Sequence, residues 1–257
     1  MNAVIPLVRL RTQEIVHTWR LWTLPTMMLV LAVAGPLLAR FTNELLTAAL
    51  GSGQAGTITL PAPTAADAYA QWTKNLTQLV LLVVVVMAAG AINTEVRSGV
   101  AALLLVKPPN RTAYVLTHAL AIAGFTALTA FLGAGVTWLA TGLIFGPADA
   151  GPLLGATAAW LVLAAVLIGA SLLASATIDA AAGAAGVGVA TFFVLAVLGA
   201  MPWLAEYTPA GLITATNAIA AGTQAPHHAL WWPIVTGLLL AVALLAVTAA
   251  TFRRREL

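Results

Sequence analysis

Four charged side chains lie close together in one short segment of this sequence, between residues 93 and 111. They are Glu95, Arg97, Lys107 and Arg111. Glu95, Gly99 and Leu103 follow one another at intervals of four, which predicts a short helix with an apolar strip, ended by Pro108 and Pro109. Such an element suits binding at a membrane surface, with Gly99 as a place where another backbone could come close. The alternative is an ordinary basic loop, and composition alone favours it.

The residue patterns of catalysis and metal binding are not found. The lysines, Lys74 and Lys107, do not belong to a phosphate-binding Gly-x-x-x-x-Gly-Lys-Ser/Thr motif, and neither Gly-x-Ser-x-Gly nor His-Glu-x-x-His occurs. No cysteine is present, which excludes thiolate metal sites and thiol nucleophiles. The adjacent pair His227 and His228 would point to opposite sides, and even the nearest carboxylate, Glu206, is distant, so no metal site is predicted. We expect no enzyme activity and no cofactor bound directly, and energy for any work must come from another chain.

The composition places these residues in a membrane protein. Of 257 residues, 7% are charged and 61% hydrophobic, and the mean hydropathy is +0.98. A soluble chain carries about 25% charged residues, because it must cover its surface with polar groups. Soluble enzymes, nucleic-acid-binding domains and disordered proteins are therefore excluded.

Six stretches are long and apolar enough to cross a bilayer as helices, which predicts an all-α membrane protein forming a single domain over 1–257. Their predicted ranges are 21–39, 76–92, 114–145, 153–177, 184–205 and 230–252. The third range exceeds what one crossing needs, so this helix either tilts or projects from the bilayer.

Basic residues predict the orientation, because short cytoplasmic loops collect arginine and lysine. An even number of spans leaves both termini on one side. That side would carry nine of the eleven basic residues: Arg9, Arg11, Arg20, Arg97, Lys107, Arg111, Arg253, Arg254 and Arg255. Arg40 and Lys74 fall on the other side. Both termini are therefore expected in the cytoplasm, and the net charge of +3 needs no nucleic-acid partner.

Three segments outside the spans have their own patterns. Residues 1–20 repeat apolar side chains at helical spacing among arginines, which predicts a helix lying in the cytoplasmic interface; a plain basic anchor is the alternative. The segment from Arg40 to Asn75 is broken by glycine and proline, so we expect an irregular external loop. The segment 206–228 is mildly apolar, and its middle, 212–221, is too short to cross, which predicts a re-entrant or interfacial helical piece.

The predicted spans contain almost no charge at their centres. Four carboxylates come near the spans, and all fall at their ends: Glu95, Asp149, Asp179 and Glu206. Ion-driven transporters usually need ionisable groups near the bilayer centre, so this pattern disfavours ion coupling. The small residues Gly142-x-x-x-Gly146 and the glycine- and alanine-rich run 183–188 are interpreted as helix-packing features.

The segment after the second span resembles, in both its sequence and its position between two spans, a loop of a known protein family. Glu95-x-x-x-Gly99, a leucine run, Lys107-Pro108 and Arg111 resemble the loop of ABC-2 type transporter permeases, written Glu-x-x-x-Gly-Thr, leucines, then Pro-x-Ser-Arg. Val100 stands where threonine or serine is usual. The layout is also similar: an N-terminal elbow helix, six spans, both termini inside and a partly re-entrant segment before the last span.

The resemblance implies an ABC-2, type V exporter-like fold and a coupling loop at 94–112. In such transporters two permeases pair, and each docks on a cytosolic nucleotide-binding ATPase that holds ATP and magnesium. The residues implied to contact the ATPase are Glu95, Arg97, Gly99, Leu104, Lys107, Pro108 and Arg111. Asp179, between spans four and five, would give a second contact, unless it only caps the helix that follows.

These observations lead us to expect the permease subunit of an ATP-driven exporter in the bacterial plasma membrane. The apolar spans favour a hydrophobic or amphipathic substrate, such as a lipid, a lipid-linked glycan, a drug or a peptide. Its partners would be the ATPase, a second permease copy or homologue, and the lipid membrane. An ion-coupled secondary transporter and a non-transporting scaffold or immunity protein are the alternatives.

Overall fold

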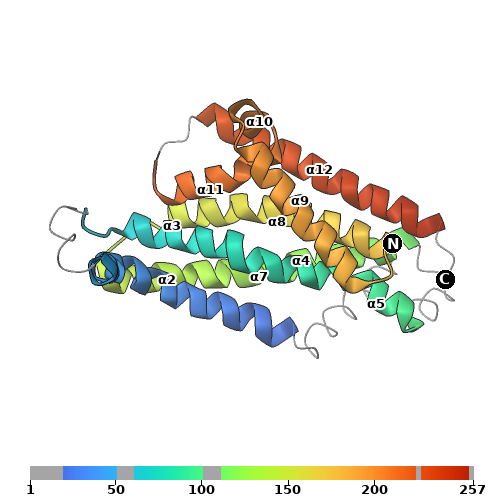
Figure 1. Cartoon of the computed structure of the whole chain (residues 1–257), viewed down its shortest axis with the longest axis horizontal. Helices are drawn as coiled ribbons and strands as arrows, with labels where there is room; N and C mark the ends of the chain where they lie inside the picture. Colours follow the sequence, from blue (N-terminus) through green and yellow to red (C-terminus); the bar gives the residue numbers. More distant parts are fainter. Residues whose placement is uncertain (1–19, 51–60, 101–110, 224–226, 255–257) are drawn as a thin grey trace.

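The computed structural model describes residues 20–50, 61–100, 111–223 and 227–254, and this part of the chain is helical with no strand (Figure 1). Six helical stretches are long and apolar enough to cross a membrane: Trp22–Leu45, Ala65–Arg97, Arg111–Phe145, Gly151–Thr177, Ala181–Gly199 and Leu230–Arg254. The prediction of an all-α, multi-pass membrane protein is therefore confirmed. The expected interfacial helix at 1–20 lies, apart from Arg20, outside the described residues.

In chain order the helices are α2 (Arg20–Leu50), α3 (Ala65–Asn75), the π-helix η2 (Leu76–Val80), α4 (Leu81–Ala89), α5 (Ala91–Arg97), α7 (Arg111–Phe145), α8 (Gly151–Thr177), α9 (Ala181–Gly199), α10 (Pro202–Tyr207), the 3-10 helix η3 (Pro209–Gly211), α11 (Leu212–Ala220) and α12 (His227–Arg254). From α7 to α12, the helices follow one another with short connections. The segment between the last two spans thus contains α10, η3 and α11.

The prediction of an irregular loop from 40 to 75 is wrong over most of its length. The first helix continues to Leu50, and α3 begins at Ala65. The start of α3 is stabilised because the Asp67 carboxylate accepts a hydrogen bond from the Thr64 backbone N–H at 2.8 Å. One face of α3 is buried through Trp72, and the other face is polar. The polar face lowers the mean hydropathy of the segment, so the sequence did not reveal that this helix extends the second span.

The fourth span, α8, is the centre of the bundle. It packs against α12, α11, α9, α4 and α7, and its side chains Trp160, Leu163 and Leu167 are fully buried. The first span, α2, packs instead on α7 and α3 at one edge. Because α8 contacts so many helices, its position determines where most of them lie.

Glycines allow close packing at particular points only. A Cβ atom at Gly188 in α9 would overlap Ser171 of α8 and Val85 of α4, so this glycine lets three helices meet. A Cβ atom at Gly142 or at Gly186 would meet nothing within 4 Å in the described chain. Of the small residues predicted to mediate packing, Gly188 does so within this chain, and so does Ala184, which is fully buried against Ala89 and Ala174.

The second span is interrupted twice. The π-helix η2 lies between α3 and α4, and a turn at Gly90 separates α4 from α5. π-helical turns are rare and frequently occur at functional sites. The turn at Gly90 sets the direction of α5, which leads into the segment that the sequence singled out.

The helices alternate in direction, so the bundle has two distinct ends, at the right and left of Figure 1. One end, called here the arginine-rich end, holds five arginines of the described chain: Arg20, Arg97, Arg111, Arg253 and Arg254. The opposite end holds two basic residues and four carboxylates: Arg40, Lys74, Glu44, Asp67, Asp149 and Glu206. The described starts of α7 and α9 and the ends of α5, α8 and α12 lie at the arginine-rich end, and α2 begins on the same side but farther from that end (Figure 1).

Candidate functional site

The structure places the described residues of the predicted coupling segment at the arginine-rich end. Glu95 and Arg97 lie in the last turns of α5, and Arg111 begins α7. The remaining three predicted contact residues lie outside the described residues: Leu104, Lys107 and Pro108. The prediction of one helix from Glu95 through Leu103 is wrong, because α5 ends at Arg97 and Gly99 has a φ of 74°. This left-handed conformation suits glycine and breaks the helix.

A serine of the central helix holds the start of α5. The hydroxyl oxygen of Ser175 accepts hydrogen bonds from the backbone N–H groups of Ile92 and Asn93, both at 3.1 Å. The first N–H groups of a helix have no partner within the helix, so an oxygen acceptor there fixes its position. Ser175 thereby ties α5 to α8 just beyond the Gly90 turn.

The Glu95 side chain is buried in a polar cluster between α5 and α7. Its residue is 7% exposed, and its Oε2 accepts a hydrogen bond from the Tyr114 hydroxyl at 2.6 Å. The His118 Nε2 lies 3.6 Å from Glu95 Oε1, too long for a direct hydrogen bond but close enough to attract the carboxylate when the imidazole is protonated. The Tyr114 and His118 rings meet edge to face with centroids 4.9 Å apart. A single carboxylate thus fixes α5 to α7.

The last helix joins this cluster through an aromatic stack and an arginine. The Phe252 ring of α12 stacks on Tyr114 with centroids 5.2 Å apart and an interplanar angle of 9°. Arg111 Nη1 donates to the carbonyl oxygen of Arg253 at 2.9 Å and, more weakly, to that of Phe252 at 3.4 Å. A cation is favourable at the carbonyl end of a helix. The two sides of the segment 98–110 are consequently fixed to α7, α8 and α12.

One buried polar side chain beside the cluster lacks partners. The Asn93 residue is 1% exposed, and neither its amide nitrogen nor its oxygen has a hydrogen-bond partner within the described residues. An unsatisfied buried polar group costs about 1–3 kcal/mol. This arrangement is therefore not optimised for stability alone, as is common where a structure also serves a function.

The other two predicted residues have different surroundings. Arg97 is exposed at the end of α5. Asp179 is exposed in the turn between α8 and α9, at the same end of the bundle (Figure 1). Since α9 begins at Ala181 with Ala180 at its N-cap, Asp179 does not occupy the capping position that was its alternative interpretation. Both side chains are exposed at the surface of the arginine-rich end.

Four residues of this site were not predicted from the sequence: Tyr114, His118, Ser175 and Phe252. A signal for two of them is visible, because Arg111, Tyr114 and His118 follow at intervals of three and four and share one face of a helix. Ser175 and Phe252 come from distant parts of the chain, and only the fold brings them here.

The cluster resembles a structural anchor more than a catalytic centre. Within the described residues, no group of three or more histidine, aspartate, glutamate or cysteine residues could hold a metal ion. The side chains of His227 and His228 lie outside the described part. With one carboxylate, one phenol and one imidazole, the cluster can transmit force between helices or bind a proton.

A family model described as a protein of unknown function (DUF2705) matches residues 57–257. The match includes α3 to α12 and therefore every residue of the buried cluster. A comparison with curated proteins finds no match.

Proposed function

From the premise that the chain belongs to the DUF2705 family, whose function is unknown, we propose that it is the membrane-spanning permease subunit of an ATP-binding cassette transporter. In this proposal a separate cytosolic ATPase binds at the arginine-rich end and supplies the energy. Two permeases, as a homodimer or with a homologue, work with two ATPases in the bacterial plasma membrane. The fold would be that of the ABC-2 permeases, whose loop the segment 94–112 resembles.

The observation that carries the proposal is the fixation of both sides of this segment. Glu95 holds the incoming side through Tyr114, and Arg111 holds the outgoing side through the end of α12. A partner that displaces the segment would therefore move α5, α7 and α12 together. Such a connection is what an ATPase needs to act on transmembrane helices.

The charge distribution supports a cytoplasmic position for this end. Five of the six described arginines lie at the arginine-rich end, whereas the four carboxylates Glu44, Asp67, Asp149 and Glu206 occupy the opposite end. Arginines near span ends favour the cytoplasmic side. The ATPase and its nucleotide would meet the chain there.

A cavity of about 350 Å³ between the second span and α9 supports an amphipathic substrate. Its walls are mostly apolar and include the rings of Phe192 and Phe193, with Gln78 at the π-helix η2. Thr77 also lines it, and the Thr77 hydroxyl is buried with no partner in the described chain. Apolar walls with a few polar groups are typical of ligand sites.

The direct test is affinity purification of the tagged chain from its native membrane, followed by mass spectrometry of the proteins that remain bound. We expect a stoichiometric ATPase with a phosphate-binding loop. Glu95→Ala and Arg111→Ala should reduce its recovery or uncouple its ATP hydrolysis, whereas Glu206→Ala, an exposed carboxylate at the opposite end, should not. Recovery of no ATPase after mild crosslinking would contradict the proposal and would favour a non-transporting scaffold or immunity protein.

A second candidate function, ion-coupled transport, is favoured by one observation. Glu95 and His118 form a buried carboxylate–imidazole pair, and groups of this kind carry protons in transporters. Ion-coupling groups are expected near the bilayer centre, whereas this pair lies near the arginine-rich end of the spans. Its position therefore makes ion coupling the weaker candidate. Uptake or efflux in vesicles driven by a proton gradient without any ATPase would establish this alternative.

A further inference from the structure

Two spans diverge beside the central helix and leave a groove between them. Both α9 and α12 pack along α8, but they scarcely contact each other. Near the opposite end, α10 and η3 pack against both and close the gap. Figure 1 shows α9 and α12 separating from there toward the arginine-rich end. The result is a wedge that is closed at one end and open at the other.

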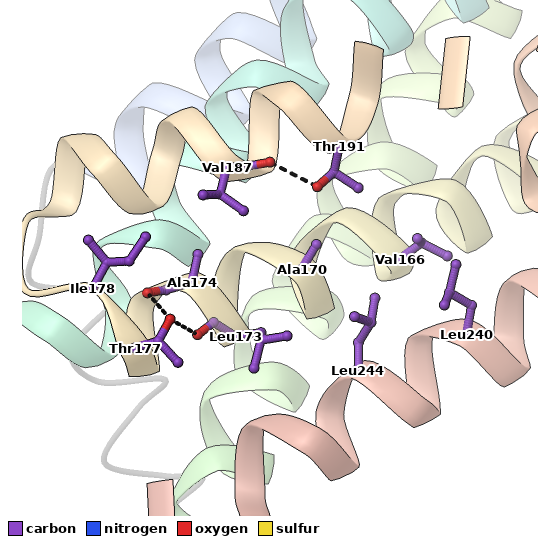
Figure 2. Close-up of a pocket in the computed structure, with 10 residues that line it drawn as sticks. All are labelled: Val166, Ala170, Leu173, Ala174, Thr177, Ile178, Val187, Thr191, Leu240 and Leu244. Atoms are coloured by element: carbon purple, nitrogen blue, oxygen red, sulfur yellow. Dashed lines mark hydrogen bonds between the residues drawn. The ribbon is translucent and has the colours of Figure 1, made fainter. Parts of the chain in front are cut away.

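The wedge contains an apolar cavity of about 470 Å³. Side chains of α8 form its floor, and Val187 of α9 and Leu240 and Leu244 of α12 lie on either side (Figure 2). The cavity reaches the turn after α8 through Ile178.

The polar atoms in this lining are already satisfied. The Thr177 hydroxyl donates to the carbonyl oxygen of Leu173 at 3.0 Å, and the Thr191 hydroxyl donates to that of Val187 at 2.8 Å (Figure 2). Both threonines therefore bond to their own helices and offer no hydroxyl hydrogen to a ligand. An occupant contacts mostly apolar surface, and between membrane helices that favours a hydrocarbon chain over water.

The mouth of the groove carries a positive charge. Arg254 is exposed and lies fourteen residues after Leu240, close to four full helical turns, so it is near the groove side of α12. Arg253 is one residue earlier and points to another side of the helix. On the other wall Asp179 is exposed beside Ile178 and would oppose an anion. Within the described residues, the five arginines at this end of the bundle outnumber the carboxylates Glu95 and Asp179, so this end attracts an anionic headgroup.

We propose that the groove between α8, α9 and α12 binds an anionic phospholipid from the leaflet at the arginine-rich end. One acyl chain fills the cavity, and the phosphate pairs with Arg254. The lipid is a resident ligand that fills the gap between α9 and α12, and it need not be transported. This inference requires that the chain lie in a membrane, but it does not depend on an ATPase partner.

Binding is tested on the purified full-length chain after delipidation, with native mass spectrometry during titration of phosphatidylglycerol or phosphatidylcholine. We expect one saturable phosphatidylglycerol per chain, bound at least tenfold more tightly than phosphatidylcholine. Leu240→Trp fills the cavity and should abolish this binding. Leu239→Trp, at the same depth on the more exposed side of α12, is the matched control and should retain it.

The headgroup contact is tested by a second matched pair. Arg254→Gln should reduce the preference for phosphatidylglycerol several-fold, whereas Arg253→Gln should leave it unchanged. If Leu240→Trp fails to fold, Val187→Trp fills the cavity from α9 instead and should have the same effect. Equal binding by Leu240→Trp and Leu239→Trp, or by Val187→Trp and the unmodified chain, would overturn the proposal, as would equal affinity for the two lipids.

Discussion

The two ends of the bundle are fixed by different kinds of interaction. At the opposite end, neutral groups hold the helices: Tyr69 donates to the Asp149 carbonyl at 3.0 Å, and the Trp72 indole donates to Thr157 at 3.2 Å. At the arginine-rich end, the buried contacts depend on the carboxylate of Glu95 and the imidazole of His118, and the guanidinium of Arg111 adds a contact nearer the surface.

This difference indicates where the molecule does its work. Neutral hydrogen bonds between tryptophan, tyrosine and threonine rigidify an interior at little cost in desolvation. Buried ionisable groups are expensive to desolvate and contribute little net stability, so a cluster of them indicates a role beyond folding. The opposite end is therefore interpreted as scaffold and the arginine-rich end as the moving or binding part.

The largest effect is expected from Glu95→Ala. The substitution leaves the Tyr114 hydroxyl and the His118 imidazole buried without their carboxylate, and breaking such a cluster costs about 3–5 kcal/mol. Thermal unfolding of the purified chain in detergent measures the loss. Glu206→Ala removes an exposed carboxylate at the opposite end and should leave the midpoint unchanged. An equal effect of both variants would remove the distinction between the ends.

A smaller loss is expected from Trp72→Phe, which tests the scaffold end. The fully buried Trp72 loses its hydrogen bond to Thr157 and leaves a small void, so we expect a stability loss of about 2 kcal/mol. Because this end is interpreted as scaffold, ATPase recovery in affinity purification should not change. If Trp72→Phe lowered ATPase recovery while Glu206→Ala did not, the opposite end would take part in binding the ATPase.

Ser175→Ala should have an effect of about 1–2 kcal/mol, because the first N–H groups of α5 lose their acceptor. Hydrogen exchange measured by mass spectrometry should show faster exchange in peptides covering α5, with no change in α3. Thr177→Ala, two residues along α8, removes a hydroxyl that bonds to its own helix and is the matched control. Unchanged exchange in α5 would mean that Ser175 does not position this helix.

The smallest effect is expected from Arg111→Gln, about 1 kcal/mol, because the bonds to the α12 carbonyls lie near the surface. Arg97→Gln changes an exposed arginine at the same end and should not affect stability. The pair sharpens the comparison, since both arginines count equally as positive charge but only Arg111 joins two helices. Equal thermal unfolding midpoints for the two variants would mean that Arg111 contributes only its positive charge to the orientation of the chain and does not stabilise the contact between α7 and α12.

Much of the fold follows from the sequence, because apolar stretches of sufficient length leave few alternatives in a membrane. The six spans were predictable for this reason, and so was the segment around Glu95, whose charges stand out. The extension of the second span through α3 was missed because its polar face conceals a buried Trp72. The partners of Glu95 depend on how α5, α7, α8 and α12 pack, and a single sequence does not reveal which helix faces meet.

The central claim is that an ATPase binds at the arginine-rich end, and site-specific crosslinking tests it most directly. The chain has no cysteine, so a single cysteine can be placed without removing others. Two variants are compared, Ser98→Cys and Thr223→Cys. Residue 98 directly follows α5, residue 223 lies shortly after α11, and both positions are exposed. After treatment of native membranes with a thiol-to-amine crosslinker, we predict that an ATPase with a phosphate-binding loop is recovered through position 98 and not through position 223. Crosslinking of no ATPase at position 98, or equal recovery at both positions, would contradict the account.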